Sequence, residues 1–197
     1  YYNWPIIYKR NNRKENIGMN NDKLMERAVM TRYATFCGTL MGLFWLAKFT
    51  LIPLGIVMPL LMMLFLALTV CVPFIGYAMA RNYRNHYRAG VISFGEAWLF
   101  LFLTFLYASL LTAMGYYIYL RFIDGGFILN SLEEMVNEFV SSLPQLQREQ
   151  MSTQMRELIN AQRSLTPITI ALQQMSQNLM MGAIMALLIA PFVKRTK

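Results

Sequence analysis

Residues 83–98, "YRNHYRAGVISFGEAW", form a short basic segment between two long apolar runs. Ala89 and Gly90 predict the end of one helix, because a glycine just after a helical stretch commonly terminates it. Ser93 and Glu96 have the spacing of a capping box, in which each side chain binds the other residue's main-chain N–H at the start of a helix. The segment therefore predicts a tight connector between two membrane helices.

Two interpretations compete for the polar side chains of this connector. Arg81, Arg84 and Arg88 are candidates for contact with anionic lipid headgroups, since basic residues next to a membrane span are attracted to that surface. His86 is the single histidine of the chain, and a general base needs an orienting partner, for which Glu96 and the nearby tyrosines are candidates. A lone histidine in a basic loop at headgroup level is more often an interfacial residue, and we favour that interpretation over catalysis.

The composition indicates an integral membrane protein. The chain of 197 residues is 56% hydrophobic and 14% charged, whereas soluble domains carry about 25% charged residues. The net charge of +8 does not indicate nucleic-acid binding, because the basic residues gather beside the apolar runs. Cys37 and Cys71 lie within apolar runs without histidine or carboxylate neighbours, so we expect small buried hydrophobic residues and no metal site or other cofactor.

Four segments are predicted to cross the membrane, and the fold class is all-α. A span needs about 20 apolar residues, a length that the fourth segment reaches only with part of the sequence before it. No charged residue is expected inside the four cores, with Lys48 and Glu96 placed at span ends. The four predicted membrane spans are residues 33–47, 54–80, 97–120 and 179–193.

The basic residues predict the orientation. They are concentrated in the N-terminal segment, in the connector at 81–96 and in the C-terminal tail, whereas 121–171 is mostly acidic. Cytoplasmic loops carry the excess of lysine and arginine, so we expect both termini and the connector in the cytoplasm and 121–171 outside. Met19 is a natural initiator, which leaves open whether residues 1–18 belong to the native protein.

The pattern resembles a bacterial inner-membrane family known as DUF4199. The most specific pieces are the "G-x-I-S-F-G-E-A" core from Gly90 to Ala97, with Val91 at the variable position, and the tyrosine-rich span that follows. The resemblance extends over about residues 30–195 and implies this fold and an inner-membrane location. It implies no activity, ligand or catalytic residue.

Small residues and prolines suggest how the spans pack. Small residues allow close approach of membrane helices, either within one chain or between copies. Pro59 and Pro73 lie in the second predicted span, where prolines kink helices; we favour a bent packing helix over a transport site. The helix-packing candidates are Gly38 and Gly42 in the first span, and Gly182, Ala186 and Ala190 in the fourth.

The segment between the third and fourth spans is predicted to hold two amphipathic helices. Ser131 and Glu134 have capping-box spacing, and Pro144 marks a stop or the first turn of the next helix. The alternatives are a self-packed hairpin, a surface-lying pair and a partner-binding pair, with Met135, Val136, Phe139 and Val140 as candidates for partner contact. The apolar stripes are Leu132, Met135, Val136, Phe139, Val140 and Leu143 in the first helix, and Leu146, Met151, Met155, Leu158 and Ile159 in the second.

The predicted organisation is a basic cytoplasmic segment (1–31), three spans (32–122), an extracytoplasmic helical insertion (123–166), and a fourth span with a basic tail (167–197). Without catalytic motifs, the sequence favours a non-enzymatic accessory or scaffold protein of the inner membrane that contacts an envelope partner or forms a homo-oligomer. The alternative is a small oligomeric transporter or channel subunit.

Overall fold

The computed structural model describes residues 4–196, except for the side chains of residues 4–20, 22, 23, 59 and 146. The described part contains seven helices and no strand. Their bounds are α1 (Trp4–Phe49), α2 (Leu51–Val57), α3 (Pro59–Tyr87), α4 (Phe94–Phe122), α5 (Phe127–Ser142), α6 (Gln145–Arg163) and α7 (Pro167–Val193).

Four segments are long and apolar enough to cross a membrane, which confirms the all-α class and the four predicted spans. Many large apolar side chains on them are exposed, including Leu60, Met63 and Phe74 on α3. Exposed apolar surface of this extent suits contact with lipid. The chain is therefore a membrane protein. The segments are Leu24–Val57, Leu60–Tyr87, Phe94–Phe122 and Pro167–Val193.

Helix α4 lies at the centre of the bundle and packs against α1 on one side and α7 on the other. Small side chains on all three helices permit these contacts: Ala34, Ala108 and Ala186 are completely buried. Phe105 of α4 lies between the two flanking helices, with its ring 6.1 Å from the Trp45 ring of α1. The core therefore combines close backbone contacts with a few large aromatic side chains.

The first hairpin differs from its prediction. The predicted second span began at 54 and contained Pro59 as a kink, but α2 ends at Val57 and Pro59 is the first residue of α3. Proline suits the first turn of a helix, where its missing N–H is not needed, and it keeps the preceding residue extended; Met58 has φ −127° and ψ 95°. Of the two prolines predicted to kink this span, Pro73 is the one that lies inside α3, beyond its first turn.

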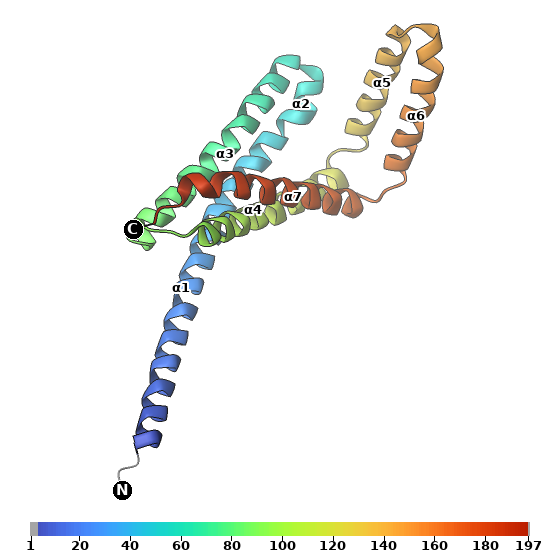
Figure 1. Cartoon of the computed structure of the whole chain (residues 1–197). Coiled ribbons are helices and arrows are strands. Elements are labelled where there is room, and N and C mark those ends of the chain that lie inside the picture. Colours follow the sequence, from blue (N-terminus) through green and yellow to red (C-terminus); the bar gives the residue numbers. More distant parts are fainter. Residues whose placement is uncertain (1–3, 197) are drawn as a thin grey trace.

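The two amphipathic helices α5 and α6 form an antiparallel hairpin that extends away from the bundle beyond the ends of α4 and α7 (Figure 1). Helix α5 begins at Phe127, four residues before Ser131, so the capping box predicted at Ser131 and Glu134 is wrong. Instead the Asp124 carboxylate accepts hydrogen bonds from the main-chain N–H groups of Gly126 and Ile128. Pro144 is the stop between the two helices.

Candidate functional site

The connector between α3 and α4 has the predicted turn. Helix α3 ends at Tyr87 with Arg88 as its C-cap, and the following Ala89 and Gly90 have positive φ angles of 48° and 80°. The Ser93 Oγ accepts a hydrogen bond from the Glu96 main-chain N–H at 3.3 Å, and the Glu96 carboxylate accepts one from the Ser93 main-chain N–H. The capping box at the start of α4 is thereby confirmed.

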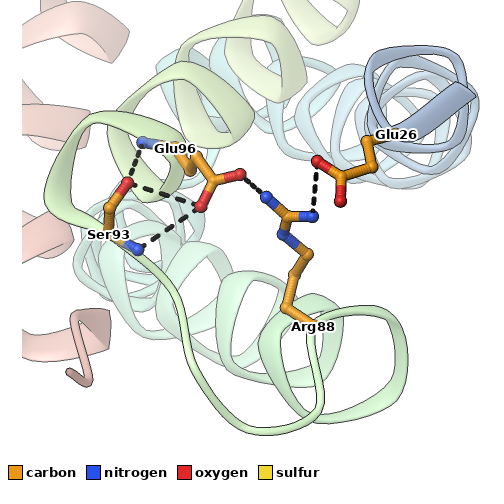
Figure 2. A network of polar contacts seen from close by, with 4 residues as sticks. All are labelled: Glu26, Arg88, Ser93 and Glu96. Carbon is orange, nitrogen blue, oxygen red and sulfur yellow. Dashed lines mark hydrogen bonds and ion pairs between the residues drawn. The ribbon is translucent and has the colours of Figure 1, made fainter. Parts of the chain in front are cut away.

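Arg88 joins three helices at this connector. Its guanidinium lies between two carboxylates, pairing with Glu96 of α4 on one side and with Glu26 of α1, at 3.1 Å, on the other (Figure 2). Arginine suits this position because its planar fork presents several donors at once. The arginine side chain is 20% exposed, so the network is partly shielded from solvent. Arg88 therefore fixes the relative position of α1, α3 and α4 at one end of the bundle.

Arg84 binds the C-terminal end of α7 to the connector end of α3. The side chain is buried, and its Nη1 donates a hydrogen bond of 2.9 Å to the Val193 carbonyl. Beside it, the main chains of Ile92 and Arg195 exchange two hydrogen bonds, of 3.0 and 3.1 Å. The connector, the C-terminal tail and Glu26 of α1 consequently lie at one end of the bundle.

These contacts differ from the predicted role of the three arginines at lipid headgroups. Arg84 is buried and Arg88 is held by two carboxylates, because the connector folds back onto α1 and α7. Arg81 is exposed, and for it the headgroup role stays a prediction.

We expect Arg88→Gln to destabilise the protein by about 1 kcal/mol, which is the upper end for exposed ion pairs and fits a network that is only partly shielded. The measurement is the midpoint of unfolding in detergent at low salt and at 1 M salt. The difference from the unaltered protein should shrink at high salt, because salt screens partly exposed pairs. An unchanged midpoint at low salt would show that the network is not stabilising.

His86 is exposed, and its ring Nδ1 lies 3.0 Å from the Asn82 carbonyl one turn earlier. Glu96, the carboxylate considered as its partner in catalysis, is bound by Arg88 instead. A base oriented only by a main-chain carbonyl of its own helix lacks the arrangement expected of a catalytic histidine.

Lys48 is the main departure from the sequence analysis, which placed it outside the apolar core. Its side chain is buried against α3, where Nζ donates to the Thr69 hydroxyl at 3.1 Å and lies 4.8 Å from the centre of the Phe65 ring. Thr69 is about 15 Å along α3 from its first residue. The cation therefore lies inside the segment Leu24–Val57, between two membrane helices.

The small residues singled out in the sequence lie where helices meet. Gly38 and Gly42 face α4, where an added Cβ at Gly38 would lie 2.5 Å from Tyr107 Cβ. Gly182 of α7 faces Phe105 of α4, with 2.6 Å between an added Cβ and Phe105 Cβ. Ala186 and Ala190 are completely buried on α7. They follow Gly182 by about one and two turns, toward the end of α7 that lies near the connector.

The partner-binding candidates on α5 differ in how far they are exposed. Met135 and Phe139 are 54% and 55% exposed. Val136 lines a cleft toward α6, and Val140 is 6% exposed. The hairpin is therefore self-packed through Val136 and Val140, while Met135 and Phe139 of the same apolar stripe are uncovered. The side chain of Leu146, placed in the α6 stripe, is not described.

A family model described as "Protein of unknown function (DUF4199)" matches residues 37–195, most of the chain. The chain belongs to this family. No curated protein and no solved structure matches it.

The DUF4199 match covers the packing glycines, the connector, the hairpin and all of α7, and Glu26 lies outside it. Two residues in the matched part were missed by sequence reasoning. Asp124 had a signal, because an Asp-Gly-Gly sequence before an apolar stripe indicates a turn that caps a helix. No local pattern in the sequence indicated the burial of Lys48, because it is buried only when α2 and α3 fold over the end of α1.

Proposed function

We propose that this DUF4199 protein is a non-enzymatic scaffold or accessory protein of the bacterial inner membrane, and that its α5–α6 hairpin contacts an envelope protein on the extracytoplasmic side. The observation that carries the proposal is the uncovered apolar face of α5, where Met135 and Phe139 are more than half exposed on a helix that extends away from the bundle. Exposed apolar residues grouped in this way commonly mark sites of protein contact.

The distribution of charge supports the orientation. Arg81, Arg84 and Arg88 lie at the same end of the bundle as the C-terminal Lys194 and Arg195. The hairpin is connected to the opposite ends of α4 and α7. Because lysine and arginine are enriched on the cytoplasmic side, the proposal places both termini in the cytoplasm and the hairpin outside.

The chemistry of the exposed face supports a protein partner. Helices that lie on membrane surfaces usually carry lysine or arginine on their polar face, whereas α5 carries Glu133, Glu134 and Glu138. Methionine adapts to irregular partner surfaces because its side chain is flexible and polarisable. An acidic helix with Met135 and Phe139 uncovered is better suited to a protein groove than to anionic headgroups.

The proposal predicts that Phe139→Glu strongly reduces the recovery of partner proteins. The change places a charge in an apolar contact, which is costly unless the charge is paired. The measurement is crosslinking in native membranes from position 135, which is available in both variants, followed by mass spectrometry of the captured proteins. Asn137→Glu adds the same charge at an exposed position of the same helix and is expected to leave recovery unchanged.

A detergent pull-down with and without residues 126–165 provides the second test. Loss of specific partners on deletion supports the proposal. Equal recovery by both forms, or an equal effect of Phe139→Glu and Asn137→Glu, would contradict it.

One observation favours a transporter or channel subunit as the second candidate. Ionisable side chains within membrane spans are rare and commonly mark ion or substrate pathways, and Lys48 is buried between α1 and α3. This candidate predicts chloride or potassium flux through liposomes that contain the protein, and a severalfold lower flux for Lys48→Met. The exposed Lys194→Met is the control. Flux equal to that of empty liposomes would exclude these two ions as substrates.

A further inference from the structure

A cleft of about 720 Å³ lies where the hairpin joins the bundle. It is formed by the end of α4, the cleft-facing sides of α5 and α6, and the beginning of α7. Ligand pockets have volumes of about 300–1,000 Å³ and a mostly apolar lining, and this cleft meets both criteria. Its apolar lining includes Leu120, Ile128, Leu132, Val136, Met155 and Ile159.

The polar groups of the cleft are few. Asp124, Gln162 and Arg163 are the hydrophilic members of the lining. The Arg163 Nη2 donates to Glu133 at 2.6 Å and to Asn130 at 3.2 Å. These two contacts use one of its three nitrogens, and a guanidinium presents five N–H donors. A long apolar surface beside a few polar groups is suited to an amphiphile.

The cleft is continuous with the lipid-facing part of the chain. Tyr116 and Leu120 belong to the span Phe94–Phe122, and Ile170 belongs to the span Pro167–Val193. Because these three residues line the cleft, its floor is made by membrane helices. It lies at the level where those helices leave the apolar layer. A lipid chain next to these helices reaches the cleft without crossing water.

We propose that this cleft binds the acyl chain of a membrane amphiphile and holds its polar head near Gln162 and Arg163. The α5 residues Ile128, Leu132 and Val136 succeed one another by one turn along the cleft, over about 12 Å of helix rise. An extended hydrocarbon chain lies against such a row. A phospholipid and a free fatty acid share this chemistry. The proposal does not depend on the partner contact, because Met135 and Phe139 are not among the residues that line the cleft.

The test is photolabelling of the purified full-length chain in nanodiscs with palmitic acid that carries a diazirine in its chain. Labelled peptides are identified by mass spectrometry. We expect label on α5 and α6, and at least fivefold less label there for Val136→Trp, which fills the cleft. Asn137→Trp adds the same ring at an exposed position of α5 that does not line the cleft and should label as the unaltered chain does. The same experiment with a diazirine-bearing phosphatidylglycerol distinguishes the two sources.

Several outcomes would overturn the proposal. Equal labelling of α5–α6 in the two tryptophan variants would show that the cleft is not the site, as would absence of label from both probes. If Val136→Trp aggregates on size-exclusion chromatography, competition in the unaltered chain decides. Excess unlabelled palmitic acid must then remove label from α5–α6 and leave the label on α3 unchanged. Equal loss at both places indicates general contact with lipid only.

Discussion

We expect Gly38→Ala to destabilise the protein by about 1–3 kcal/mol, the range for an added methyl group in a packed interior. An added Cβ would lie 2.5 Å from Tyr107 Cβ and 2.8 Å from the Thr104 carbonyl oxygen. The second contact is with main chain, which does not move aside as a flexible side chain does. Helix α1 must therefore shift away from α4, and the shift reduces packing along their whole contact. Alanine is intrinsically the better helix former by about 1 kcal/mol, so a loss of stability isolates the packing effect.

Gly95→Ala is the matched control. It is the same substitution in the first turn of α4, where an added Cβ meets nothing within 4 Å. We expect it to leave stability unchanged or slightly raised, as measured by the midpoint of unfolding in detergent. If the two variants unfold at the same midpoint, the close contact between α1 and α4 is absent and the described bundle is incorrect.

The second large effect is expected for Arg84→Met, which should destabilise the protein by about 2 kcal/mol. Hydrogen bonds to charged groups contribute about 1.5–3 kcal/mol, and this change removes the donor of the Val193 carbonyl while keeping a side chain of similar length. The end of α7 then loses a buried hydrogen bond to α3. The expected result is a lower unfolding midpoint and faster proteolysis of the C-terminal tail.

Arg81→Met is the control for this prediction. Arg81 is exposed and lies about one turn earlier on the same helix, so the change removes the same charge without a buried contact. Surface substitutions usually alter stability by less than about 0.5 kcal/mol. Equal effects of the two variants would mean that net charge, and not the bond to Val193, stabilises this end of the bundle.

Local signals in the sequence predicted much of the fold. Length and apolarity located the four spans, the Ala-Gly pair located the end of α3, and Ser93 with Glu96 located the start of α4. These features depend on neighbours within a few residues, so a single sequence contains the information needed. The two helices of the hairpin were predicted for the same reason, from apolar stripes on either side of Pro144, whereas their packing against each other was one of three alternatives.

Contacts between distant segments were not predictable in this way. Ser131 has the spacing of a helix cap, but the turn after Asp124 starts the helix earlier and leaves Ser131 inside it. Arg84 and Arg88 have the composition of headgroup ligands, and the return of α1 and α7 to the connector gives them protein partners instead. The burial of Lys48 likewise depends on α3, which lies beside it only in the folded chain.

The proposed topology places the connector and the hairpin on opposite sides of the membrane. It is tested most directly by reporter fusions at positions 85 and 150, with enzymes that are active in only one compartment each. We expect a cytoplasmic signal at Asn85 and an extracytoplasmic signal at Gln150. Signals from the same compartment at both positions would contradict the four-span arrangement and the proposed partner contact.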